Sequence, residues 1–148
     1  MATCRICFGG EEDGALIMNA CPCRDDGMSS VIHRACLIKS AQSRCTQGDQ
    51  HAWTKCDVCK HYYVGEAEMV LAQHHHDKCR SLGSDHPNAL TSQSNLANAL
   101  ADQGKYADAA RLYRSTIDAE KRVLGPEHPS TLISQSSLAT VLRDQGKY

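Results

Sequence analysis

The sequence predicts a chain of two parts, a small cysteine-rich unit over residues 1–64 and an all-α array of helical repeats over residues 65–148. The first observation behind this division is that eight of the nine cysteines lie before residue 60 and none follows Cys79. The second is an internal repeat in the later part. The third is composition, because one Trp and one Phe in 148 residues leave little bulky material for one large core.

Charge and hydropathy narrow the classes of function. The formal net charge is −1, the pI is near 6.7, and Lys and Arg are scattered. We therefore expect no nucleic-acid binding, which needs a concentrated basic surface. No basic start precedes an apolar stretch of signal-peptide type, and no apolar run approaches the ~18 residues of a membrane span. We expect a soluble protein of the cytoplasm or nucleus with no membrane contact. In such a reducing compartment, cysteines are metal ligands or free thiols rather than disulfides.

Eight potential metal ligands form four closely spaced pairs in the first part. The pairs are Cys4-x2-Cys7, Cys21-x-Cys23, His33-x2-Cys36 and Cys56-x2-Cys59. A closed structural zinc site takes four Cys or His ligands, so eight ligands predict two structural Zn2+ ions with no position open for water. Closed sites fold a domain rather than catalyse, and metal binding worth on the order of 10 kcal/mol per site would dominate folding. We therefore expect no catalytic residue in this unit.

The remaining cysteines and a histidine run are expected to be ordinary. Cys45 and Cys79 have no partner at ligand spacing and are predicted to be free thiols. His75 and Cys79, within HHHDKC (74–79), share one helical face. Two ligands do not make a structural zinc site, so a solvated helix is the expectation there.

The ligand order of four Cys, one His and three Cys is shared by PHD fingers and RING-CH fingers. The nine residues between Cys23 and His33 fit the RING-CH spacing better than the shorter PHD spacing, which disfavours a histone reader. The motifs CRIC (4–7), CPC (21–23) and VIHRACL (31–37) resemble the RING-CH signature, over residues 4 to about 64. The resemblance implies a small zinc-stabilised α+β finger of cross-brace type. One zinc would be held by Cys4, Cys7, His33 and Cys36, and the other by Cys21, Cys23, Cys56 and Cys59.

RING-CH proteins are mostly E3 ubiquitin ligases. The resemblance implies that the finger grips a ubiquitin-charged E2 enzyme and holds its thioester in a reactive geometry, with no covalent intermediate on the finger. It assigns E2 contacts to Ile6 and Pro22 and a basic linchpin to Lys60. Ile6 as plain core and Lys60 as a solvated surface lysine stay open as alternatives.

One position departs from the family pattern. Ser40 stands where RING-CH fingers usually have a Trp that floors the E2 groove, and the chain's only Trp is Trp53. Trp53 either packs the second zinc loop or replaces the missing Trp from another direction. Ser40 favours an alternative function, a non-catalytic zinc-dependent scaffold for protein–protein interaction, whereas Ile6, Pro22 and Lys60 favour the ligase.

The second part contains an internal repeat. HPNALTSQSNLANALADQGKY (86–106) and HPSTLISQSSLATVLRDQGKY (128–148) agree at 14 of 21 positions with an offset of 42. The apolar residues of each copy fall at helical spacing, and GKY supplies a turn before a second helix. That second helix is predicted from about Tyr106 to Leu124, with Ala109, Ala110, Tyr113 and Ile117 as its apolar stripe, and Gly125-Pro126 ends it.

These repeats resemble tetratricopeptide repeats of kinesin light chain type, which carry NLA, GKY and LGxxHP motifs. The LGxxHP motif at 82–87, which ends a repeat, places a lone second helix at 66–82. The array stops at Tyr148, where another helix is expected. The repeats therefore look incomplete, and the chain is expected to be a fragment or a truncated gene product. The resemblance implies that the repeats bind a protein substrate, with Asn95 and Asn98 on the concave, peptide-binding face. The second copy has Ser137 and Thr140 there.

Overall fold

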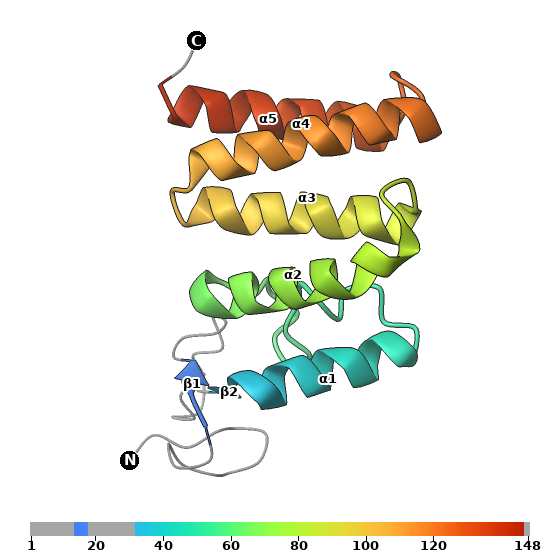
Figure 1. The fold of residues 1–148 in the computed structure, drawn as a ribbon. Coiled ribbons are helices and arrows are strands. Elements are labelled where there is room, and N and C mark those ends of the chain that lie inside the picture. Colours follow the sequence, from blue (N-terminus) through green and yellow to red (C-terminus); the bar gives the residue numbers. More distant parts are fainter. Residues whose placement is uncertain (1–13, 18–31, 147–148) are drawn as a thin grey trace. The chain divides into compact units, whose positions relative to one another are not determined.

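The computed structural model describes residues 14–17 and 32–146 (Figure 1). The chain divides into two compact units, Met1–His74 and His75–Tyr148, and the boundary along the chain falls within helix α2 (Gly65–Cys79). We call them the finger unit and the repeat unit. The domain boundary predicted from the sequence, between residues 64 and 65, stays a prediction.

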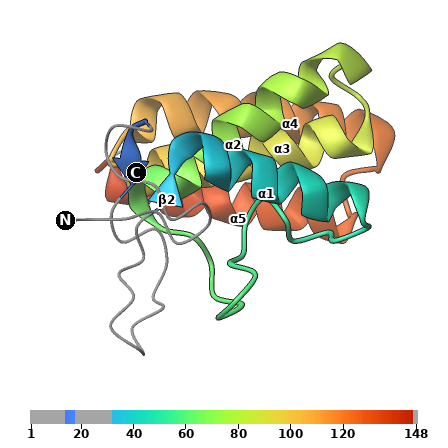
Figure 2. The ribbon, with the colours of Figure 1, turned by 90° about the horizontal axis from the view of Figure 1, so that it is seen from below.

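The finger unit contains a short strand pair that leads into a helix. Strand β1 (Leu16–Ile17) pairs antiparallel with β2 (Ile32–His33), so that Ile17 lies opposite Ile32. β2 continues directly into α1 (Arg34–Thr46), which begins beside the strand pair (Figures 1 and 2). The backbone N–H of Arg34 donates to the carbonyl of Ala15 at 3.1 Å, which ties the first turn of α1 to the start of β1.

The core of the finger unit joins these elements to the segment after α1 and to the first turns of α2. Its buried residues include Ile17 and Ile32 from the strands and Leu37 from α1. Trp53, Cys56 and Tyr63 come from the segment that connects α1 to α2, and Ala67, Val70 and Leu71 come from α2. Among the described residues, this core holds the strand pair, α1, the connecting segment and the start of α2 together.

The repeat unit is all-α, as the sequence predicts. After the short 3-10 helix η2 (Arg80–Leu82) come α3 (Pro87–Asp102), α4 (Tyr106–Val123) and α5 (Pro129–Asp144). α4 packs beside both α3 and α5 (Figure 1). The four residues predicted as the apolar stripe of the second helix are all buried, which confirms the predicted face: Ala109, Ala110, Tyr113 and Ile117.

Residues of the LGxxHP motif end one helix and cap the next. Gly125 has φ +96°, a left-handed conformation that glycine adopts readily, and it lies just past the end of α4. His128 then caps α5 through its Nδ1, which accepts from the N–H of Ser130 at 3.2 Å, and Pro129 occupies the first turn. His86 caps α3 in the same way through the N–H of Asn88, at 3.1 Å.

Candidate functional site

His33 and Cys36 form the first pair of expected ligands that the structure describes. His33 is the last residue of β2 and is 2% exposed, and Cys36 lies in the first turn of α1. The Sγ atom of Cys36 lies 3.9 Å from Nδ1 of His33. Zn–S of about 2.3 Å and Zn–N of about 2.0–2.1 Å at a tetrahedral angle would separate the two atoms by about 3.6 Å. The pair therefore fits two ligands of one tetrahedral zinc.

Cys56 and Cys59 lie in a tight hairpin between α1 and α2. Lys55 and Tyr62 form an antiparallel bridge, and the N–H of Cys56 donates to the carbonyl of His61 at 2.9 Å. The N–H of Lys60 donates back to the carbonyl of Cys56 at 3.1 Å, and Lys60 has φ +60°. Cys56 is buried in the core and Cys59 packs against it. The turn thus closes the C-x2-C segment on itself, as a shared ion requires.

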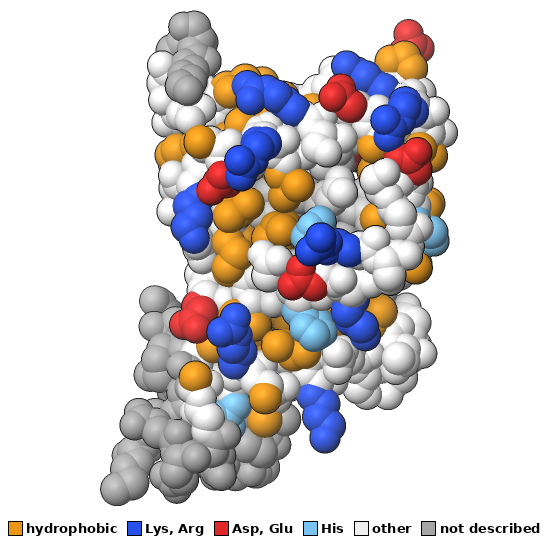
Figure 3. All heavy atoms as spheres, viewed as in Figure 1, with side chains coloured by type: hydrophobic (Ala, Val, Ile, Leu, Met, Phe, Trp, Pro, Cys, Tyr) orange, Lys and Arg blue, Asp and Glu red, His pale blue; other side chains and the backbone are white. Residues whose placement is uncertain are grey.

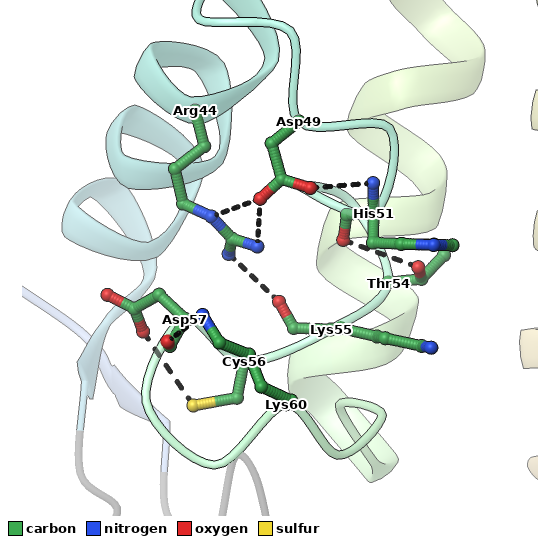
Figure 4. Close-up of polar contacts among 8 residues, drawn as sticks. All are labelled: Arg44, Asp49, His51, Thr54, Lys55, Cys56, Asp57 and Lys60. Atoms are coloured by element: carbon green, nitrogen blue, oxygen red, sulfur yellow. Dashed lines mark hydrogen bonds and ion pairs between the residues drawn. The ribbon is translucent and has the colours of Figure 1, made fainter.

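An arginine holds this hairpin against α1. Nε and one terminal nitrogen of Arg44 donate to Oδ2 of Asp49 at 2.8 and 2.5 Å, and the other terminal nitrogen donates to the carbonyl of Lys55 at 2.8 Å (Figure 4). Oδ1 of Asp49 accepts from the N–H of His51 at 2.8 Å. The bonds from His51 and from Arg44 lower the pKa of Asp49. We call this set, Arg44 with Asp49 and the Lys55 carbonyl, the Arg44 clamp.

The sequence does not predict the Arg44 clamp. The clamp fixes the residue directly before Cys56 to the helix that carries Cys36, and so it positions two pairs of expected ligands relative to each other. A sequence signal for it hardly exists, because one of its acceptors is a main-chain carbonyl that any residue could supply.

Ser40 and Lys60, two positions singled out in the sequence, line one surface hollow of about 640 Å³. Its other lining residues come from α1 and from the hairpin: Cys36, Lys39, Ser43, Arg44 and Asp57. Lys60 is exposed, and its ammonium group donates to the carbonyl of Asp57. The hollow therefore brings together the position where the family has Trp and the position of the expected linchpin.

Trp53 occupies a different place. It is 7% exposed in the finger core together with Cys56, and its ring stacks on His74 of α2 with 5.6 Å between centroids. It does not line the hollow beside Ser40. Of the two roles open from the sequence, packing near Cys56 and Cys59 is the one that the geometry favours.

More than half of the residues expected in the site of the finger lie outside the described residues: Cys4, Ile6, Cys7, Cys21, Pro22 and Cys23. Within 14–17 and 32–146, no three His, Cys, Asp or Glu side chains gather as a metal site. The cross-brace pairing and the count of two zinc ions therefore stay predictions, and the His33–Cys36 separation supports only that these two residues can share one ion. Cys45 is exposed and Cys79 is buried.

The repeat unit carries a second candidate site. A groove of about 400 Å³ is lined by Asn98 and residues of α3, α4 and α5, and we call it the repeat groove. Asn98 Oδ1 accepts from the hydroxyl of Tyr113, which is 1% exposed. Asn95 is half-buried and does not line the groove. The structure thus separates the two asparagines, and a peptide-binding role for either stays a prediction.

The surface charges of the described residues are mixed. On the face seen in Figure 3, acidic and basic side chains are interspersed with hydrophobic ones. No described helix is long and apolar enough to cross a membrane.

The geometry defines a class of protein in which a helical repeat array follows a cysteine-rich unit. Residues 90–148 match the family model of the tetratricopeptide repeat. Over 60 residues the chain is 40% identical to the E3 ubiquitin-protein ligase MARCHF4 of Mus musculus and of Homo sapiens. It is 38% identical over 60 residues to the E3 ubiquitin-protein ligase MARCHF11 of Rattus norvegicus. Both predicted resemblances, to RING-CH ubiquitin ligases and to tetratricopeptide repeats, are confirmed.

These matches are partial. The segment shared with the ligases is 40% of this chain, and it spans only 12–13% of the length of those relatives. The homology therefore concerns one segment, and it supports ubiquitin ligase chemistry only at the level of the family.

Proposed function

We propose that the chain is an E3 ubiquitin ligase of RING-CH type, in which the finger unit binds a ubiquitin-charged E2 enzyme and the repeat unit binds the protein substrate. The homology to ubiquitin ligases motivates the proposal. The observation that carries it is the hollow that Ser40 and Lys60 line together, beside the expected zinc ligand Cys36. Two structural zinc ions, when bound, would supply the folding energy of the finger and take no part in the transfer.

The residues of the finger would act by binding and orientation. Ile6 and Pro22 would supply apolar contact to the E2. The ammonium group of Lys60, exposed at the tip of the hairpin, would donate to both E2 and ubiquitin and restrict the thioester to reactive orientations. Transfer would then occur from the E2 to a substrate amine, with no bond to the finger.

An autoubiquitination assay with purified protein and a panel of E2 enzymes tests the proposal. Ile6→Ala keeps every zinc ligand, and loss of an apolar anchor should cost about 1–3 kcal/mol of E2 binding, which weakens transfer about ten-fold or more. Cys36→Ser removes a ligand and should abolish transfer together with zinc binding. Lys121→Ala, an exposed lysine of α4, is the matched surface control and should have no effect.

Lys60 needs two variants, because its side chain and its backbone act separately. Lys60→Ala removes the ammonium group but keeps a residue with a Cβ at φ +60°, so the backbone strain stays. Lys60→Gly removes the same group and also relieves this strain, which is roughly 1–2 kcal/mol. Both should slow transfer while E2 affinity barely changes, since a linchpin acts on the charged complex. Slow transfer by Lys60→Ala alone would assign the effect to stability instead.

Ser40→Trp separates the ligase from the runner-up. The hollow at Ser40 can accept an indole ring, and restoring the family's Trp should raise E2 affinity and transfer. The alternative function, a non-catalytic zinc-dependent scaffold, rests on the serine at this position. It takes over if neither wild type nor Ser40→Trp transfers ubiquitin with any E2 while zinc stays bound. A location in the cytoplasm or nucleus, without nucleic-acid or membrane binding, belongs to the same proposal.

A further inference from the structure

The repeat groove is built from three helices and is polar at its walls. Asn98 and Asp102 come from α3, and Thr140 and Asp144 come from α5. Hydroxyl groups of Ser136, Ser137 and Tyr106 add donors and acceptors along the walls. Such a lining suits the backbone of an extended peptide, which needs partners for its own N–H and C=O groups.

The charged side chains in the described lining of the groove are both acidic. Asp102 and Asp144 are exposed and occupy equivalent positions of the two copies, and the described lining contains neither Lys nor Arg. Oδ1 of Asp144 accepts from Nε of the adjacent Arg143 at 3.1 Å, with side chains 42% and 65% exposed. An exposed pair of this kind contributes little and leaves the carboxylate open to a better partner.

The negative charge of Asp102 also acts on Tyr113, at the floor of the groove. Tyr113 is buried beneath it, and its hydroxyl donates to Asn98. Burial raises the pKa of Tyr113, a hydrogen bond with Ser137 lowers it, and the negative charge of Asp102 raises it further. The carboxylate of Asp102 is therefore close enough to act on the floor, where the low-dielectric surroundings strengthen its field.

We propose that the repeat groove binds an extended, basic peptide segment, whose Lys or Arg side chains pair with Asp102 and Asp144. The inference rests on the proposed substrate binding by the repeats and names the chemistry of the substrate. Asn98 keeps its amide N–H groups for the peptide backbone, because the amide oxygen is already bonded to Tyr113.

The test is fluorescence anisotropy on the whole 148-residue chain, prepared with zinc, with labelled peptide pools. One pool has Lys or Arg fixed at alternate positions, a second has Glu and a third has Gln, with mixed residues elsewhere. The basic pool should bind about ten-fold or more tightly than the neutral pool, and added salt should weaken this preference. The acidic pool should bind least.

Two double variants make the matched comparison. Asp102→Asn/Asp144→Asn should abolish the preference for the basic pool. Asp108→Asn/Asp118→Asn changes the net charge equally on exposed positions of α4 outside the groove, and should preserve it. Thermal unfolding by circular dichroism verifies that both variants fold.

The outcomes separate this inference from the proposed function. Equal binding of the three pools, or equal behaviour of the two double variants, overturns the inference and leaves peptide binding by the repeats intact. Absence of binding by every pool overturns both.

Discussion

Removal of Arg44 should destabilise the finger unit, because its guanidinium group joins α1 to the segment that carries Cys56. The side chain of Arg44 is 16% exposed and that of Asp49 is 34% exposed, so the clamp is partly shielded from solvent. Arg44→Ala removes two charge-assisted bonds to Asp49 and leaves the Lys55 carbonyl without this donor. Hydrogen bonds to charged groups contribute about 1.5–3 kcal/mol and exposed ion pairs under about 1, so we expect a loss of about 2–3 kcal/mol.

The loss should reach the metal. In the proposed function the finger unit folds together with its zinc, so a loss of about 2–3 kcal/mol would lower zinc affinity up to about a hundred-fold. Arg44→Lys keeps the charge without the planar fork and should lose about 1–2 kcal/mol. Arg111→Ala is the matched control, because Arg111 pairs with Asp108 at 2.8 Å with side chains 80% and 53% exposed, and should cost under about 0.5 kcal/mol.

The assay uses the chain's only Trp. Trp53 lies in the core of the finger unit, so its fluorescence during urea unfolding follows that unit. Competition with a chelator measures zinc affinity on the same samples. If Arg44→Ala matches Arg111→Ala in both measurements, the clamp does not position the ligand pairs and its hydrogen bonds are incidental.

Three further predictions address the metal, the pH dependence and the repeats. Elemental analysis under reducing conditions should give two zinc ions per chain, and a chelator should unfold the finger unit while sparing most of the helical signal; one zinc or none would refute the double site. Burial raises the pKa of Glu120 above its ordinary 4.5, although a hydrogen bond with Ser134 and the charge of His128 oppose the shift. The contribution of Glu120 to stability is therefore fully present below 4.5, and it is lost as the pH rises through the higher pKa of the folded state. Glu120→Gln should therefore gain stability over wild type on going from acid to neutral pH in thermal unfolding, and a constant difference would contradict this. Leu90→Ala should cost about 2–4 kcal/mol of stability, because the Leu90 side chain is 3% exposed. Leu132→Ala, at the same repeat position, should cost under about 1 kcal/mol, because Leu132 is 50% exposed. Equal costs in urea unfolding would show that exposure does not decide the difference.

The repeat unit was largely predictable from sequence because its signals are local. The predicted second helix ended at about Leu124, and α4 ends at Val123 with Leu124 as its cap residue. Gly125 and Pro129 mark the junction in the sequence as they do in the structure. The sequence does not predict the caps at His86 and His128, because histidine is not among the residues that usually cap a helix N-terminus.

The finger unit was predictable in its ligands and less so in its architecture. The short gaps identify His33, Cys36, Cys56 and Cys59 as pairs without any knowledge of the fold. Helix α1 was not anticipated, because only Leu37 and Ala41 of its 13 residues are buried and its apolar pattern is weak. The Arg44 clamp and the hollow at Ser40 depend on contacts between residues distant in sequence, which spacing alone does not encode.

The two repeat copies show how far a sequence pattern can determine burial. Ala97 is fully buried in the cluster that it forms with Ala109, Ala110 and Tyr113 of α4, whereas Ala139, at the equivalent position, is exposed. The residue and its helical position are the same, and the difference is that α4 follows α3 while no further helix follows α5 among the described residues. In a solenoid each helix buries its apolar face only against its neighbours, so periodicity predicts which face is apolar and the neighbour determines whether that face is covered. For the same reason the repeat groove is a property of three successive helices, and its two carboxylates act together only because α4 packs against both α3 and α5.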